Sequence, residues 1–158
     1  MSKVVIDETF ELPLGIDDAY AFLISPPAYQ TFIGWGPIPG IERLEWQQGD
    51  SSKVGSFATV HNKDGSTHRE TVVVADAPTA YAIEIDRFSS IFDKLVKNAS
   101  ERWSLSAAGD ATRVERSFSF TLRSPVMKPI GLIIGRFFRK AVKVNHAEML
   151  RHLSRTKS

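Results

Sequence analysis

The last third of the chain most constrains its fold, because alternation typical of a strand gives way there to one long amphipathic stretch. Residues 114–120 alternate between apolar and polar side chains, as a half-buried strand does. Ser124 and Pro125 then suit an N-cap and a first helical residue. One long helix after a run of antiparallel strands has only the sheet to cover its apolar stripe. We therefore expect a helix laid over a sheet, with a cavity between them.

Helical spacing predicts which side chains of this helix face the sheet. The predicted stripe consists of Ile130, Ile133, Ile134, Phe137, Val144 and Leu150. Gly131 and Gly135 form a G-x-x-x-G pattern, which we expect to let the helix approach the sheet closely or bend at the mouth of the cavity.

The rest of the chain indicates strands and two short helices. Strands are predicted at residues 3–12, 41–48, 54–62, 67–76, 79–88, 98–107 and 111–123, and helices at 16–24 and 27–33. The Gly/Pro-rich segment 34–40 is predicted to be a loop, with Trp35 as either a lid or an ordinary packing residue. Length and ordinary composition predict a single domain over residues 1–158.

Three turns predict which side chains share a face of the sheet. They lie at Asp64-Gly65, at residues 76–79 and at Gly109-Asp110. The predicted cross-strand pairs are His61 with His68, Thr59 with Glu70, Phe57 with Val72, Val74 with Tyr81, Val72 with Ile83, Glu70 with Ile85, His68 with Arg87, Leu105 with Val114, Trp103 with Arg116, and Glu101 with Phe118.

This register predicts charges of both signs among the aromatic residues on the helix-facing side. The polar set is Glu70, Arg87, Glu101 and Arg116, joined by His61, His68 and Glu8. Arg116 is placed opposite Trp103 and diagonal to Glu101, within reach of an ion pair or a cation–π contact. Buried charges are costly without partners, which leaves three interpretations: an internal ion pair, recognition of a ligand's polar group, or acid–base catalysis. In the catalytic case Glu101 or Glu70 would be the base, and Arg116 or Arg87 would hold an oxyanion.

The order of these elements resembles the helix-grip (SRPBCC) superfamily, which includes START lipid-binding domains, pollen allergens and polyketide cyclase/dehydrase-like proteins. The resemblance rests on Phe10-Glu11-Leu12-Pro13, on the helix at residues 17–23, on the strand at residues 101–105 and on the closing helix. It implies an α+β fold, in which a curved seven-stranded antiparallel sheet wraps around the long C-terminal helix. Members of the superfamily bind lipids, sterols, quinones, polyketides or plant hormones, and some cyclise, dehydrate or hydrolyse.

The expected function is binding of a hydrophobic or amphipathic small molecule, such as a lipid, a quinone or a polyketide-like compound. The alternative is an enzyme of the polyketide cyclase/dehydratase type that uses the same polar residues. The expected ligand-binding residues are Glu70, Tyr81, Arg87, Glu101, Trp103, Arg116, Phe118, Phe120 and Phe137. The sequence singles out no catalytic residue among them.

Charge is unevenly distributed along the chain. Residues 123–158 contain nine basic residues and one acidic residue, Glu148, so this segment carries +8 and the remainder −6. A solvated outer helix face explains this pattern, and peripheral contact with an anionic membrane surface or with an acidic partner is the alternative. No nucleic-acid motif is present, and we expect no nucleic-acid partner.

The residue types that are present and absent also limit which chemical functions the chain can have. The absence of cysteine excludes disulfides and thiolate metal sites. His61, His68 and Glu70 formally resemble a two-histidine, one-carboxylate site, but they lie near a hairpin tip, and we expect no metal and no cofactor. Acidic residues near the start argue against a signal peptide, and no segment has the length of a membrane span. A cytoplasmic monomer or homodimer is expected.

Overall fold

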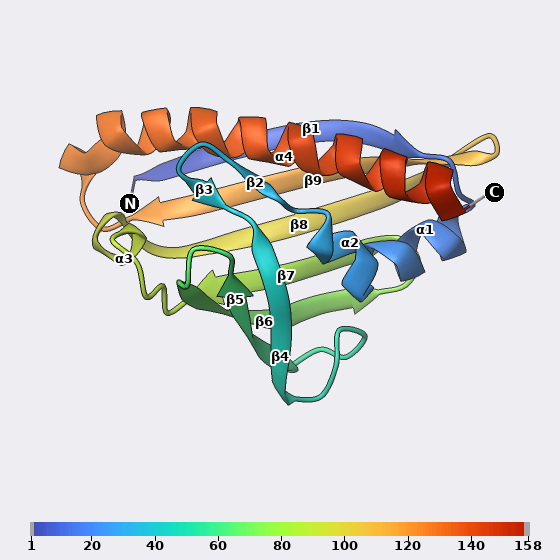
Figure 1. Cartoon of the computed structure of the whole chain (residues 1–158), viewed down its shortest axis with the longest axis horizontal. Helices are drawn as coiled ribbons and strands as arrows, with labels where there is room; N and C mark the ends of the chain where they lie inside the picture. Colours follow the sequence, from blue (N-terminus) through green and yellow to red (C-terminus); the bar gives the residue numbers. More distant parts are fainter. Residues whose placement is uncertain (1, 157–158) are drawn as a thin grey trace.

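The computed structural model describes residues 2–156 and confirms a curved antiparallel sheet with a long C-terminal helix (Figure 1). The strands are β1 Lys3–Leu12, β2 Gly34–Trp35, β3 Ile38–Pro39, β4 Ile41–Gln48, β5 Phe57–Asn62, β6 Thr67–Asp76, β7 Ala80–Asp86, β8 Val96–Ala108 and β9 Ala111–Leu122. The helices are α1 Ile16–Leu23, α2 Pro26–Gln30, α3 Phe92–Leu95, the 3₁₀ turn η1 Pro125–Met127 and α4 Lys128–Thr156.

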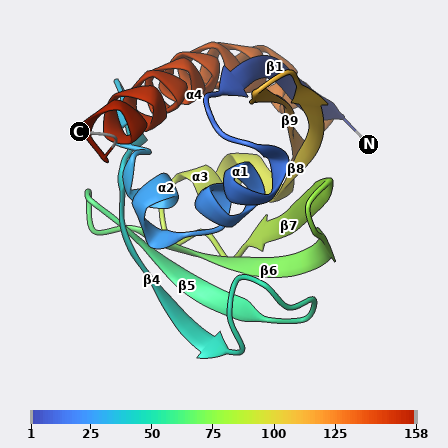
Figure 2. The ribbon, with the colours of Figure 1, turned by 90° about the vertical axis from the view of Figure 1, so that its right-hand side faces the viewer.

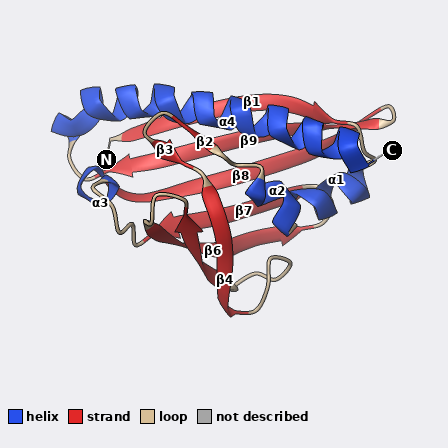
Figure 3. Ribbon diagram, viewed as in Figure 1, coloured by secondary structure: helices blue, strands red, loops and turns tan. Residues whose placement is uncertain are grey.

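The main sheet has seven strands in the order β1-β9-β8-β7-β6-β5-β4. The first strand pairs with the last one, from Lys3 opposite Thr121 to Leu12 opposite Thr112. Figure 2 shows the sheet curling from β1, beside α4, round to β4, with α1 and α2 inside the curve. Figure 3 shows α1 and α2 near the C-terminal end of α4, whereas α3 lies near its N-terminal end. The curve and these helices together surround the interior.

Two short elements differ from expectation. The segment predicted as a loop contains the two-stranded hairpin β2–β3, in which Gly34 pairs with Pro39 and Trp35 with Ile38. A Cβ on Gly34 would lie 2.3 Å from the Ile38 carbonyl oxygen, so this hairpin needs glycine there. The four-residue helix α3 was not predicted at all. Both elements are too short to leave a periodic pattern in the sequence.

The β5–β6 register is shifted by one residue from the predicted one. Val60 lies opposite His68 and Ala58 opposite Glu70, because the Asn62 amide donates to the Ser66 carbonyl oxygen across a three-residue turn, residues 63–65, in which Gly65 adopts a φ of +87°. The shift turns alternate side chains to the other face. His61 and Phe57 therefore do not face the helix as predicted, and Asn62 takes an inward position instead.

The β6–β7 pairing follows the prediction only in part. Val72 lies opposite Ile83 and Glu70 opposite Ile85, as predicted. A bulge between Val72 and Val74 then places Ala75, rather than Val74, opposite Tyr81. The β8–β9 pairs, including Trp103 with Arg116 and Glu101 with Phe118, agree with the prediction.

Only part of the predicted stripe of α4 faces the sheet, because Ile134 lies on the inner side but three other members of the stripe do not. Ile130 and Ile133 are 56% and 53% exposed, and Leu150 is exposed as well. Gly131 and Gly135 face the sheet, which confirms the predicted close approach, and an added Cβ on either would lie 3.0 Å from a side chain of β9 or β1. The close approach of helix and sheet requires small residues at these positions, so the large ones turn outward.

Two features concern the start of the closing helix and the outer edge of the sheet. The side chain of Ser124 accepts a hydrogen bond from the Val126 backbone, which confirms it as an N-cap ahead of η1 and α4. At the far edge of the sheet, the pairing of β4 with β5 is interrupted twice, between Ile41 and Arg43 and between Trp46 and Gln48.

Candidate functional site

A cavity of about 340 Å³ lies between the inner face of the sheet and α4. Its lining comes from β4 to β9, from α1 to α4 and from the β2–β3 hairpin. On α4 the lining side chains are Ile134, Phe138, Asn145 and Met149, at the helical spacing 4, 7 and 4 residues apart. Apolar surface dominates this lining, which is the usual character of a small-molecule pocket.

Aromatic rings form one wall of the cavity. Phe138 of α4 meets Phe118 and Phe120 of β9 edge to face, with ring centroids 4.7 and 4.9 Å apart. Phe92 of α3 contacts Phe120 in the same manner at 5.9 Å. Because Phe118 and Phe120 alternate with polar residues along β9, they point to the same face of the sheet. Edge-to-face contacts of this kind hold the rings in fixed positions.

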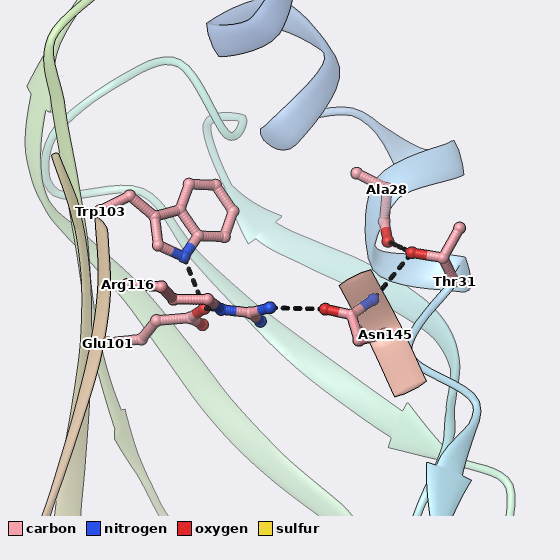
Figure 4. A network of polar contacts seen from close by, with 6 residues as sticks. All are labelled: Ala28, Thr31, Glu101, Trp103, Arg116 and Asn145. Carbon is pink, nitrogen blue, oxygen red and sulfur yellow. Dashed lines mark hydrogen bonds and ion pairs between the residues drawn. The ribbon is translucent and has the colours of Figure 1, made fainter. Parts of the chain in front are cut away.

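A buried ion pair lies at the other side of the cavity (Figure 4). Arg116 donates from Nε to Glu101 Oε2 at 2.6 Å, and Trp103 Nε1 donates to the same oxygen at 2.7 Å. The guanidinium also lies over the rings of Trp103 and Phe118, with its carbon 5.7 and 4.8 Å from the ring centroids. Glu101 and Arg116 are only 8% and 6% exposed. The ion pair and the cation–π contact predicted for Arg116 are both present.

The ion pair continues into α4 and α2. Arg116 Nη1 donates to Asn145 Oδ1 at 2.6 Å, and Asn145 Nδ2 donates to Thr31 Oγ1 at 2.8 Å. The Thr31 hydroxyl in turn donates to the Ala28 carbonyl oxygen. Figure 4 shows these groups in a row from the sheet, through α4, to α2. The row fixes the orientation of the guanidinium relative to three elements.

Burial and the neighbouring donors shift the pKa of Glu101 in opposite directions. Burial raises the pKa of Glu101 above its ordinary range, while Arg116 and the hydrogen bonds to that carboxylate act against the rise. Glu70, the second carboxylate of the interior, adds to the rise. The Tyr81 hydroxyl donates to the Ser51 carbonyl oxygen at 2.7 Å, and burial raises its pKa, so this phenol stays protonated.

His146 lies beside this network but does not line the cavity. Its ring stacks on Phe10 with centroids 3.6 Å apart, and its Nε2 has no hydrogen-bond partner among the described residues. Burial, with the nearby Arg116 charge, lowers the pKa of His146 to about 3. The imidazole is therefore neutral at physiological pH.

Seven of the nine predicted ligand-binding residues line the cavity. They are Glu70, Tyr81, Glu101, Trp103, Arg116, Phe118 and Phe120. The other two lie elsewhere. Arg87 is exposed because β7 ends at Asp86 and Arg87 itself has a φ of +56°, which turns it out of the strand. Phe137 lies on the outer side of α4, where it stacks on Trp35, and neither of these two rings lines the cavity.

Several residues of the site were not predicted. Asn145, Thr31, Asn62 and Phe138 all contribute to the lining or to its hydrogen bonds. Asn145 had a signal in the sequence, because it interrupts the apolar series Phe138, Val142, Met149 at helical spacing. Asn62 had none, since its position depends on the one-residue shift of the β5–β6 register.

Comparisons with known proteins agree with this architecture. Residues 3–156 match the family described as polyketide cyclase / dehydrase and lipid transport. No curated protein matches the sequence.

Solved structures show the same fold at low sequence identity. Ara h 8.0201 has a TM-score of 0.67 at 15% identity, covering 94% of this chain and 99% of that one. Major latex-like protein 151 from Panax ginseng has a TM-score of 0.68 at 14% identity, covering 95% and 97%. Norcoclaurine synthase from Thalictrum flavum, solved with dopamine and hydroxybenzaldehyde, has a TM-score of 0.63 at 16% identity, covering 94% and 87%.

Proposed function

The chain belongs to the polyketide cyclase/dehydrase and lipid transport family, and from this premise we propose that it binds a hydrophobic or amphipathic small molecule in the cavity beneath α4. The observation that carries the proposal is a guanidinium at the wall of an apolar cavity. Arg116 uses Nε and Nη1 within the protein, whereas its Nη2 donates to no residue within the described range 2–156. A ligand oxygen is the partner that this nitrogen lacks.

The volume of the cavity narrows the class of ligand. Pockets for small molecules span about 300–1,000 Å³, and the present cavity of about 340 Å³ lies at the lower end of that range. This volume suits a quinone-like or polyketide-like ring system better than a long-chain lipid. The ring would pack against Trp103, Phe118 and Phe138 while its oxygen reaches Arg116.

A cyclase or dehydratase activity is the alternative, and it rests on the raised pKa of Glu101. A general acid must hold a proton that it can give to the ligand. Oε2 of Glu101 accepts from both Arg116 and Trp103, and these bonds act against protonation of the carboxylate, which suits a group that positions the guanidinium. We therefore favour binding over catalysis.

Filling the cavity should abolish binding without unfolding the protein. In the variant Ile134→Trp, the indole would occupy space that a ligand needs, and we expect affinity for naphthol, measured by fluorescence titration, to fall at least about tenfold. Leu132→Trp adds the same ring on the exposed side of α4 and serves as the matched control. Native mass spectrometry of the purified protein should detect any retained ligand in the control alone. Equal naphthol affinity in both variants would contradict the proposal.

We also propose a peripheral contact with anionic membranes through the N-terminal half of α4. Val126, Ile130 and Ile133 form an exposed apolar stripe, and Arg136 and Lys140 are exposed one to two turns further on. Lys140 lies over the Trp35 ring, with its nitrogen 5.8 Å from the centroid. Apolar and basic residues in this arrangement suit a helix lying at a membrane surface. None of the helices in the described part of the chain could cross a membrane.

Vesicle sedimentation tests this contact. The double variant Ile130→Ser/Ile133→Ser should bind vesicles containing phosphatidylserine about ten- to hundredfold more weakly, because it no longer has two half-exposed apolar side chains that can insert into the membrane interface. Val54→Ser removes an exposed apolar side chain on the β4–β5 loop, away from α4, and should leave binding unchanged (Figure 1). Arg136→Gln/Lys140→Gln should weaken binding at low salt. Binding that resists salt and tolerates the loss of both isoleucines would overturn the contact.

A further inference from the structure

Besides Arg116, a second charged side chain of the cavity lining, Glu70, is available to a ligand. Glu70 of β6 lines the cavity, and its Oε2 lies 3.2 Å from His68 Nε2. The Glu70 charge raises the pKa of Tyr29 on α2 and of Tyr81 on β7, in addition to burial, and it acts on Glu101 of β8 as well. The Glu70 carboxylate therefore lies within electrostatic reach of ionisable groups on three separate elements around the cavity.

The hydrogen bonds around His68 have a fixed direction, which can be followed from the β5–β6 turn. The Ser66 hydroxyl donates to Asp64 Oδ1 at 2.5 Å, and this bond, with one from the Ser66 backbone, lowers the pKa of Asp64 and keeps it ionised. Since the single proton of that hydroxyl is used, Ser66 Oγ must accept from Asn62 Nδ2 at 3.2 Å. The atom of Asn62 next to Ser66 is therefore the amide nitrogen.

The same amide fixes the tautomer of His68. Asn62 Nδ2 also lies 3.3 Å from His68 Nδ1, and as a donor it requires an unprotonated nitrogen there. The proton of the neutral imidazole is then on Nε2, from which it is donated to Glu70. A proton on Nδ1 would instead point at the Asn62 amide hydrogens, so the hydrogen bonds favour the tautomer that is protonated on Nε2. His68 is thereby a hydrogen-bond donor to Oε2 of Glu70.

One oxygen of Glu70 remains available in this arrangement. Oε1 accepts no hydrogen bond from residues 2–156. Among the described residues that line the cavity, Glu101 is paired with the guanidinium of Arg116, whereas no guanidinium or ammonium group pairs with Glu70. The excess of negative charge favours a ligand group that donates hydrogen bonds, and an ammonium gains most from it.

We propose that Glu70 is a second anchoring site of the cavity, which takes a hydrogen-bond donor of the ligand, an ammonium or a hydroxyl group, while His68 positions the carboxylate. The inference rests on the proposed binding function and deepens it. A ligand of this kind carries an acceptor oxygen for Arg116 and a donor for Glu70 on one apolar body. His68, Asn62 and Ser66 act through Glu70 and do not themselves contact the ligand donor.

A set of four naphthalene probes with one substituent each at the same ring position tests the anchoring site. Calorimetry should rank aminomethylnaphthalene and naphthol above methoxynaphthalene, whereas naphthoate has no donor for Glu70 and reports on binding through Arg116 alone. Glu70→Gln should lower affinity for aminomethylnaphthalene about ten- to hundredfold, as expected for a lost charged hydrogen bond, and leave methoxynaphthalene unchanged. Glu84→Gln removes an exposed carboxylate on β7 and should alter no probe. Equal affinities for all four probes, unaffected by Glu70→Gln, would contradict the anchoring site at Glu70 but not the proposed binding function. Failure of every probe to bind would instead contradict the proposed binding function, on which the anchoring site rests.

Nitrogen NMR of the unliganded protein tests the hydrogen-bond chain independently. At neutral pH the His68 ring should show protonated Nε2 and unprotonated Nδ1. Ser66→Ala removes the acceptor that orients the Asn62 amide, so the other tautomer should gain population in that variant. A proton on Nδ1 in the wild-type protein would contradict the assignment whether or not any probe binds.

Discussion

Replacing Arg116 with methionine should lower the free energy of unfolding by about 3–5 kcal/mol, as expected when one partner of a buried ion pair is removed. The loss strands the Glu101 carboxylate among apolar residues and removes the donor to Asn145 Oδ1. Because the carboxyl group can take up a proton, the destabilisation should be smaller at acidic than at alkaline pH. Denaturant unfolding at several pH values measures both effects.

The double variant Glu101→Leu/Arg116→Met separates structure from binding. With both charges gone, most of the lost stability should return, because an apolar pair of similar volume avoids the desolvation cost. Arg102→Met, on the outer face of the next position of β8, should change the free energy of unfolding by less than about 0.5 kcal/mol. If the double variant is stable but no longer binds naphthol, the pair serves the ligand. A single variant within about 1 kcal/mol of the wild type would argue that the pair contributes little.

Acid should destabilise the protein through His146. The unfolded chain takes up a proton at this residue near its ordinary pKa of 6.5, whereas the folded protein does so only near 3. Between these values unfolding is accompanied by proton uptake, so the free energy of unfolding should fall by up to about 1.4 kcal/mol for each unit of decreasing pH. Lowering the pH from 6 to 4 should thus cost about 2–3 kcal/mol.

The variant His146→Phe provides the reference for this pH dependence. It keeps a ring against Phe10 and removes the buried nitrogen that has no hydrogen-bond partner in the described part of the chain. Its stability at neutral pH should equal or exceed that of the wild type, by about 1 kcal/mol at most. The raised pKa of Glu101 acts in the opposite sense, with stability lost as the pH rises, but it is present in both proteins and cancels in their difference. Parallel pH curves for the two proteins would exclude the assigned role of His146.

Sequence patterns predicted the strands that show a sustained alternation of apolar and polar residues and the hairpin with a clear two-residue turn. The bounds of β4 and β6 agree with the predicted ranges 41–48 and 67–76, and the β8–β9 register follows from the two-residue turn at Gly109-Asp110. The Glu101–Arg116 contact depends on that register alone. This is why the central pair of the site could be located before the structure was known.

Other parts depend on three-dimensional contacts that a sequence pattern does not contain. A three-residue rather than two-residue loop at Asp64-Gly65 moved Asn62 inward and His61 outward. The G-x-x-x-G pattern predicted the close approach of α4 to the sheet, but not that this approach turns Ile130 and Ile133 outward. In both cases the sequence suits two arrangements locally, and packing against distant elements decides between them.

The interrupted pairing of β4 bears on how copies of the protein behave at high concentration. An open sheet edge invites another strand to add to it, and a long regular edge is a hazard for aggregation. On β4, two bulges break the regular spacing of backbone groups, and the charged side chains of Glu42, Arg43 and Glu45 are exposed along it. A second chain could not extend this edge in continuous register without burying those charges. The curved sheet can therefore remain open on one side while resisting growth into a fibre.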